Sequence, residues 1–128
     1  MTAHAFRLRA PRPARAWNHL LATLEAPSPA HAGFAPDRLL QEVRGALADA
    51  GLLAPGEHAH RFEPQGFSFL GFGPEVRLAL HTWPEHGLAT LDLYAPDGGE
   101  ALVASLVRRL GWRVREQRAH PRTTGETR

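Results

Sequence analysis

The sequence predicts an α+β fold, a two-layer sandwich in which an antiparallel-dominated sheet carries two principal helices on one face. Two observations predict this class. Four short stretches with strand character follow one another between residues 57 and 96, and amphipathic helical periodicity precedes them at 37–50 and follows them at 99–110. The chain has 128 residues, of which 43% are hydrophobic and 22% charged, so residues 1–128 are expected to form a single domain.

The first part of the chain is expected to supply one strand and one helix. Residues 5–10 alternate as a short strand does, and Pro11 and Pro13 end that pattern. The next stretch, 14–25, has apolar residues at helical spacing and therefore predicts a helix. These residues are Trp17, Leu20, Leu21 and Leu24.

The two principal helices have recognisable ends. The helix over 37–50 can be capped by the Asp37 side chain and is followed by Gly51, where a left-handed residue is favoured. The helix over 99–110 is apolar on one face and stops at Gly111. Both helices can therefore cover a sheet with their apolar faces.

The strands are expected at 58–63, 67–72, 76–82, 88–95 and 112–118, separated by turns rich in proline and glycine. The strand over 67–72 is apolar on both sides, since Leu70 and Phe72 alternate with Phe67 and Phe69. A central strand, or a face buried against a partner, explains this pattern and favours a dimer. Residues 119–128 are expected to form a flexible tail.

Composition excludes several classes of function. The chain has no cysteine, which rules out disulfides and thiolate chemistry and favours the cytoplasm. No apolar run is long enough to cross a membrane, and the N-terminus lacks the pattern of a secretory signal. All 15 basic residues are arginine against 13 acids, so the net charge of +2 describes a weakly basic protein despite a pI near 10.3.

Isolated residue types do not define a site. The chain has eight histidines, among them His58 with His60 and His81 with His86, but their spacing does not predict three or four convergent ligands, so no metal is expected. No glycine-rich phosphate loop is present, and Ser68 lacks a nucleophile-elbow pattern. Composition and spacing alone therefore leave the function open.

One segment carries more information. Residues 81–87 read His-Thr-Trp-Pro-Glu-His-Gly, residues 60–68 read His-Arg-Phe-Glu-Pro-Gln-Gly-Phe-Ser, and residues 89–94 read Ala-Thr-Leu-Asp-Leu-Tyr. These motifs resemble those of the short prokaryotic S-adenosylmethionine decarboxylases, pyruvoyl enzymes of spermidine biosynthesis. The resemblance is strongest over residues 60–94 and implies the decarboxylase-like sandwich fold.

The resemblance also shows where this chain departs from the family. Family members cleave themselves at a Glu-Ser bond and convert the serine into the pyruvoyl group, whereas here Glu75 is followed by Val76. Valine has no hydroxyl to attack the preceding carbonyl. The position of the family's catalytic cysteine is Pro96, while Ser68 and His81, which resemble the residues that assist processing, are retained. We therefore expect no pyruvoyl cofactor and a pseudoenzyme that is not cleaved.

The resemblance implies a ligand site and partners. Trp83, Glu85 and His86 are candidates for binding an S-adenosylmethionine-like or polyamine ligand. The chain is expected to form a homodimer, or a heterodimer with an active family paralogue.

Two other functions stay open. The inherited pocket could serve a non-pyruvoyl chemistry with His81, Glu85 or His86 as general acid or base. A nucleic-acid binder ranks last, because aromatic residues among the C-terminal arginines are few. These arginines are Arg108, Arg109, Arg113, Arg115, Arg118, Arg122 and Arg128.

Overall fold

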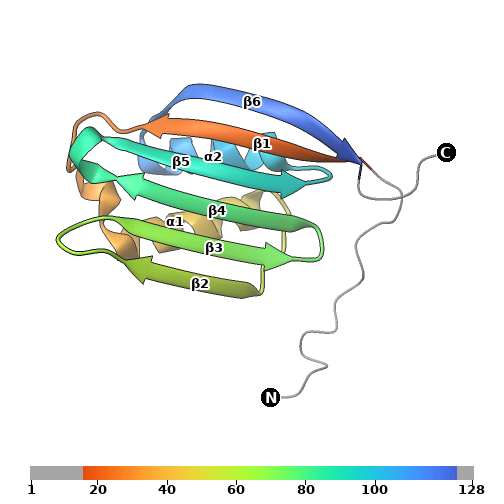
Figure 1. Cartoon of the computed structure of the whole chain (residues 1–128), viewed down its shortest axis with the longest axis horizontal. Coiled ribbons are helices and arrows are strands. Elements are labelled where there is room, and N and C mark those ends of the chain that lie inside the picture. The colour runs from red at the N-terminus through yellow and green to blue at the C-terminus, as the bar shows by residue number, and fades with distance from the viewer. Residues whose placement is uncertain (1–15, 124–128) are drawn as a thin grey trace, which may run out of the picture.

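The computed structural model describes residues 16–123, which form one six-stranded sheet with two helices against one of its faces (Figure 1). The strand order is β2-β3-β4-β5-β1-β6, and every neighbouring pair is antiparallel. This confirms the expected two-layer α+β sandwich. The elements are β1 (Ala16–Glu25), η2 (Ala32–Phe34), α1 (Pro36–Asp49), β2 (Gly56–Arg61), β3 (Phe67–Gly73), β4 (Val76–Trp83), η3 (Pro84–His86), β5 (Leu88–Ala95), α2 (Gly99–Leu110) and β6 (Arg113–Thr123).

The hydrophobic core lies between the sheet and the two helices. On β4, Val76, Leu78 and Leu80 alternate toward the helices and are buried. Leu39 and Val43 of α1, like Leu102 and Leu106 of α2, are fully buried opposite them. Burying side chains of this size stabilises the fold by roughly 1.5–3 kcal/mol each, so this layer dominates the folding energy.

The expected helix over 14–25 is wrong, since residues 16–25 form β1. Leu20, Ala22 and Leu24 are buried, whereas His19 and Leu21 are not, which is the alternation of a strand. β1 lies between β5 and β6 and hydrogen-bonds to both. Pairing on both edges overrides a local helical preference, because two ladders satisfy the backbone while the alternate residues are buried. The strand expected at 5–10 lies outside the described residues.

The expected flexible tail is also wrong over residues 119–123, which continue β6 along β1. Ala119 pairs with Leu20, and Pro121 pairs with Asn18. Proline is tolerated here because β6 is the edge of the sheet, where one side of the strand needs no partner. Residues 124–128 lie outside the described residues.

The helix ends differ from expectation at one position. Asp37 does not cap α1; the N-cap is Ala35, which makes no side-chain cap hydrogen bond, and Pro36 occupies the first turn. The Asp37 carboxylate instead accepts a hydrogen bond from Arg61 Nη2 at 2.7 Å. Gly51 has the left-handed conformation expected after α1, with φ of 71°.

The second face of the sheet is not covered by any helix of residues 16–123, and we call it the open face (Figure 1). Leu70 and Phe72 of β3 lie on it, with 42% and 51% of their surface exposed. Phe67 and Phe69 of the same strand are buried toward the helices. β3 is therefore apolar on both sides, as its sequence predicts.

Candidate functional site

Ser68 and His81 form a hydrogen-bonded pair on the open face. They are directly opposed on β3 and β4, and 2.6 Å separates Ser68 Oγ from His81 Nδ1. His60 pairs with Ser68 from β2, and the Trp83 ring centroid lies 6.4 Å from that of His81. The retained residues Ser68 and His81 of the family motif thus lie close together on the open face.

The turn after β4 holds the remaining motif residues. η3 is closed by Gly87, whose φ of 68° suits glycine, and Pro84 is buried beneath it. Glu85 accepts a long hydrogen bond, 3.4 Å, from Gln65 Nε2. Within residues 16–123, no hydrogen bond joins Glu85 to His81 or His86. These contacts do not favour an acid–base group made of His81, Glu85 and His86. That one of them acts as a general acid or base stays a prediction.

The departures from the family lie at the other end of the sheet. Val76 begins β4 and is 0% exposed, with its side chain in the core on the helix side. Pro96 follows β5 at the same end, and its carbonyl oxygen accepts a hydrogen bond from Asn18 Nδ2 at 3.5 Å. His81 lies five residue steps along β4 from Val76, which is about 16 Å at the rise of a strand. Within one chain, the Ser68–His81 pair therefore does not come close to Val76 and Pro96.

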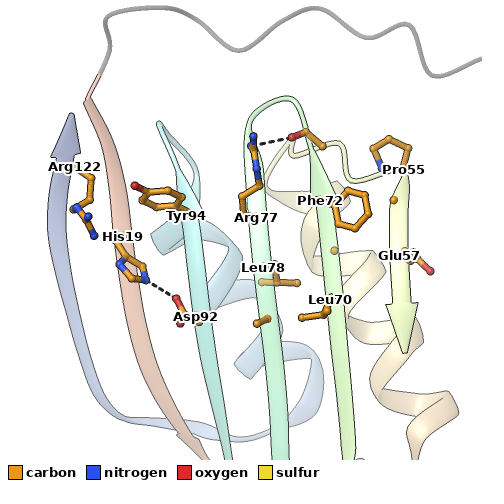
Figure 2. A pocket seen from close by; sticks show the side chains of 14 residues that line it. His19, Pro55, Glu57, Leu70, Phe72, Arg77, Leu78, Asp92, Tyr94 and Arg122 are labelled. Atoms are coloured by element: carbon orange, nitrogen blue, oxygen red, sulfur yellow. Dashed lines mark hydrogen bonds and ion pairs between the residues drawn. The ribbon is translucent and has the colours of Figure 1, made fainter. Parts of the chain in front are cut away.

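A cavity of about 1230 Å³ opens at the Val76 end of the open face (Figure 2). Leu70 and Phe72 contribute apolar surface, while Arg77, Tyr94 and Arg122 contribute polar groups. The sequence does not indicate this cavity, because it predicts a helix for the segment that holds His19 and a tail for the segment that holds Arg122. Only a strand pattern over 16–25 could have indicated it.

The acidic groups of this cavity are paired. His19 Nε2 lies 2.5 Å from a carboxylate oxygen of Asp92. Glu57 accepts hydrogen bonds from Arg44 Nη2 at 2.6 Å and from Nε at 2.9 Å, and these bonds hold the pKa of the Glu57 carboxyl below its usual value. Both carboxylates of the cavity therefore have a hydrogen-bond partner, and that of Glu57 is a guanidinium.

No group of three or more metal-ligating side chains occurs among residues 16–123, and no helix of that part of the chain is long and apolar enough to cross a membrane. The arginines near the C-terminus are partly neutralised. Arg109 is paired with Asp49 and Glu42, and Arg113 with Glu25. This pairing reduces the basic surface that a nucleic-acid binder would need.

The geometry defines a two-layer sandwich protein whose uncovered sheet face carries a serine–histidine pair beside a Trp-Pro-Glu turn. Residues 30–123 match the family model described as S-adenosylmethionine decarboxylase. The chain therefore belongs to the S-adenosylmethionine decarboxylase family.

Individual relatives agree with this assignment. An S-adenosylmethionine decarboxylase proenzyme of Persephonella marina is 40% identical over 58 residues, which cover 45% of this chain and 44% of the relative. One of Thermoplasma acidophilum is 34% identical over 77 residues, 58% of this chain and 59% of the relative. The matched segments span less than half the length of the first curated relatives.

The crystal structure of the adenosylmethionine decarboxylase from Aquifex aeolicus has the same fold. It superposes with a TM-score of 0.74 at 25% sequence identity and covers 91% of this chain and 98% of its own. The likeness extends over nearly the whole sandwich, including segments outside the motif at 60–94.

The family assignment corrects one expectation. From Val76 and Pro96 the sequence predicts that the protein has no cofactor, and this prediction is wrong. The curated relatives are pyruvoyl-dependent proenzymes, and the structure does not show that the pyruvoyl group has been lost. Position 76 itself does not fit the group: a buried valine carries no hydroxyl from which a pyruvoyl group can form.

Proposed function

We propose that this chain is a subunit of an S-adenosylmethionine decarboxylase-type assembly in polyamine biosynthesis, and that it is not cleaved between Glu75 and Val76. It pairs through its open face with a second family chain, either a copy of itself or a paralogue that carries the serine. In the second case the pyruvoyl group of the assembly comes from the paralogue. We expect the assembly in the cytoplasm, as the composition predicts.

The observation that carries this proposal is the separation of the two half-sites. The Ser68–His81 pair lies at one end of the open face, and the Glu75–Val76 bond lies at the opposite end of β4. A two-fold axis perpendicular to the strands would place one end of the first sheet over the opposite end of the second. Pairing of two open faces would thus bring the Ser68–His81 pair of one chain near the Glu75–Val76 bond of the other. Within one chain these groups are about 16 Å apart.

The chemistry of the open face supports pairing. Leu70 and Phe72 are joined there by Leu21 of β1, 37% exposed, and by Trp83 of β4, 42% exposed. Exposure of several large apolar side chains on one face of a monomer is unfavourable in water, and a partner that covers them removes this exposure. The ligand of the assembly is proposed to be S-adenosylmethionine-like or a polyamine, with Trp83, Glu85 and His86 as its candidate contacts.

The oligomeric state tests this proposal. Size-exclusion chromatography with light scattering should give a dimer at micromolar concentration, and Leu70→Glu should give a monomer because it places a charge on the open face. Leu53→Glu is the matched control, since Leu53 is equally apolar and 59% exposed but precedes β2 and lies outside the open-face strands. A strict monomer at high micromolar concentration, or equal behaviour of the two variants, would contradict the pairing.

A further inference from the structure

We propose that the outer edge of β6 binds an extended acidic segment of another protein, which adds to the sheet as a further strand. β6 is the last strand of the sheet and pairs only with β1, so its other edge has no neighbouring strand within residues 16–123 (Figure 1). Pairing of two open faces would cover a face of the sheet and not this edge. The inference therefore does not depend on the proposed pairing.

The outer edge of β6 presents backbone groups to a partner. About half of the N–H and C=O groups of an edge strand point away from its one neighbour, and another extended chain can pair with them. β6 is long enough for such a ladder, because it has 11 residues. Pro121 lacks an N–H but keeps its carbonyl oxygen as an acceptor. Main-chain hydrogen bonds would thus supply part of the affinity for an added strand.

The C-terminal part of β6 has little cover from the rest of the fold. Val114 is half-buried and packs against the core, but every residue from 115 to 122 is exposed. In this stretch the ladder with β1, rather than side-chain burial, holds the strand in place. An added strand would give the stretch a second ladder.

The charge of this edge favours an acidic partner. Arg115, Arg118 and Arg122 make no hydrogen bond or ion pair with another residue of the described range 16–123. Arg113, in contrast, is paired with Glu25 at 2.5 Å. Glu116 is the single acid of β6. The edge therefore carries positive charge that its own chain does not neutralise, and an acidic strand complements it.

The opposite edge of the sheet differs in this respect. On β2, Glu57 is paired with Arg44 and Arg61 with Asp37, both through α1. Unpaired charge of one sign is thus a property of the β6 edge.

Like charge opposes pairing of β6 with a second copy of itself. Each copy would contribute the unpaired arginines Arg115, Arg118 and Arg122 against the single acid Glu116. The occupant that complements this edge is therefore an acidic segment of another protein.

The spacing of two arginines defines the pattern of that segment. Arg118 and Arg122 are four residues apart on one strand, so their side chains lie on the same face. Acidic residues four positions apart on the added strand would lie opposite both arginines. Acidic residues three positions apart would lie on opposite faces, and only one of them could pair. The expected partner has acid-x-x-x-acid in an extended segment.

Fluorescence anisotropy of labelled peptides titrated with the full chain tests the inference. A peptide of threonine and valine with two glutamates four residues apart should bind about tenfold more tightly than the same peptide with glutamines. Glutamates three residues apart should give an affinity about threefold weaker. Methylation of one alternate set of backbone nitrogens should abolish binding, and methylation of the other set should not, because only alternate amides face the edge.

Single substitutions locate the effect. Arg118→Gln and Arg122→Gln should each weaken binding of the glutamate peptide by about threefold and leave the glutamine peptide unchanged. Arg108→Gln is the matched control, because Arg108 is an exposed arginine of α2 and the change in net charge is the same. Far-ultraviolet circular dichroism checks that each variant folds.

Several results would overturn the inference. These are equal binding of the glutamate and glutamine peptides, equal effects of the two methylation patterns, equal loss in Arg108→Gln, or no binding at millimolar concentration. Tighter binding of oligouridylate than of the peptide would assign the edge to a nucleic acid instead. Conversion of a dimer of the chain into a monomer by the peptide would assign the edge to a second copy.

Discussion

Ser68 and His81 are held 2.6 Å apart on the open face, while Val76, on the same strand as His81, is buried on the helix side. The Ser68–His81 pair, whose residues resemble processing assistants, and the Glu75–Val76 bond thus lie toward opposite ends of β4. One chain alone therefore does not place Ser68 and His81 beside the Glu75–Val76 bond.

The first prediction concerns the Glu75–Val76 bond. Denaturing mass spectrometry of the purified chain should show one species near 14.1 kDa, because no side-chain hydroxyl at position 76 can attack the preceding carbonyl. Val76→Ser should also stay intact when the chain is monomeric, since Ser68 and His81 are about 16 Å away. Two fragments that meet at Glu75–Val76 in the wild type would contradict this.

Thr82 is predicted to hold the start of β3. Its buried Oγ1 accepts a hydrogen bond from the backbone N–H of Phe67 at 3.0 Å. Thr82→Val would leave that buried N–H without this acceptor and should lower the free energy of unfolding by about 1–3 kcal/mol. Thr82→Ser keeps the hydroxyl and should cost clearly less. Urea denaturation of both variants measures the difference, and equal losses would show that the hydrogen bond is not the cause.

Gly73 is predicted to tolerate no side chain. A Cβ atom added there would overlap the carbonyl oxygen of Leu53, and backbone cannot move aside as a side-chain tip can. Gly73→Ala should therefore destabilise the fold by more than Gly51→Ala, which meets open space and costs about 1–2 kcal/mol for its positive φ alone. Thermal melts of the two variants give the order, and the reverse order would refute the steric argument.

Asp49 links stability to pH. Hydrogen bonds from Arg109 and Ser105 hold the pKa of the Asp49 carboxyl below its usual value. A carboxyl with a lower pKa in the folded chain stabilises it above the unfolded pKa, and the stabilisation is lost as pH falls through the folded value. Wild-type stability should thus drop on acidification from neutral pH.

The Asp49 effect has a matched control. Arg109→Gln should flatten the acid drop in the free energy of unfolding, because Asp49 loses its main hydrogen-bond donor. Arg115→Gln removes an exposed arginine of β6 that has no ion pair with any described residue, and it should leave the drop unchanged. Urea titrations at a series of pH values provide the comparison. Parallel curves for all three proteins would disprove the link.

Much of the fold could be predicted from the sequence because its signals are local. The periodicity of 37–50 and 99–110 and the turns around Gly73 and Gly87 indicated both helices and β3 to β5 within a few residues. The motif at 81–87 indicated the family for the same reason, since a turn and its flanking strands are continuous in the chain. The identity of residue 76 likewise needs no structure to exclude a hydroxyl there.

The tertiary structure alone decided the rest. Residues 16–25 have helical spacing, yet they form β1 because β5 and β6 satisfy both of its edges, and residues 119–123 are ordered because β1 provides a template. The same pairings place His19 and Arg122 on the sheet face that carries Arg77, so that all three line one cavity. Such contacts join segments about a hundred residues apart, so no local pattern records them. The sequence by itself determined which chemistry position 76 excludes, and the packing of the sheet decided which groups can act together.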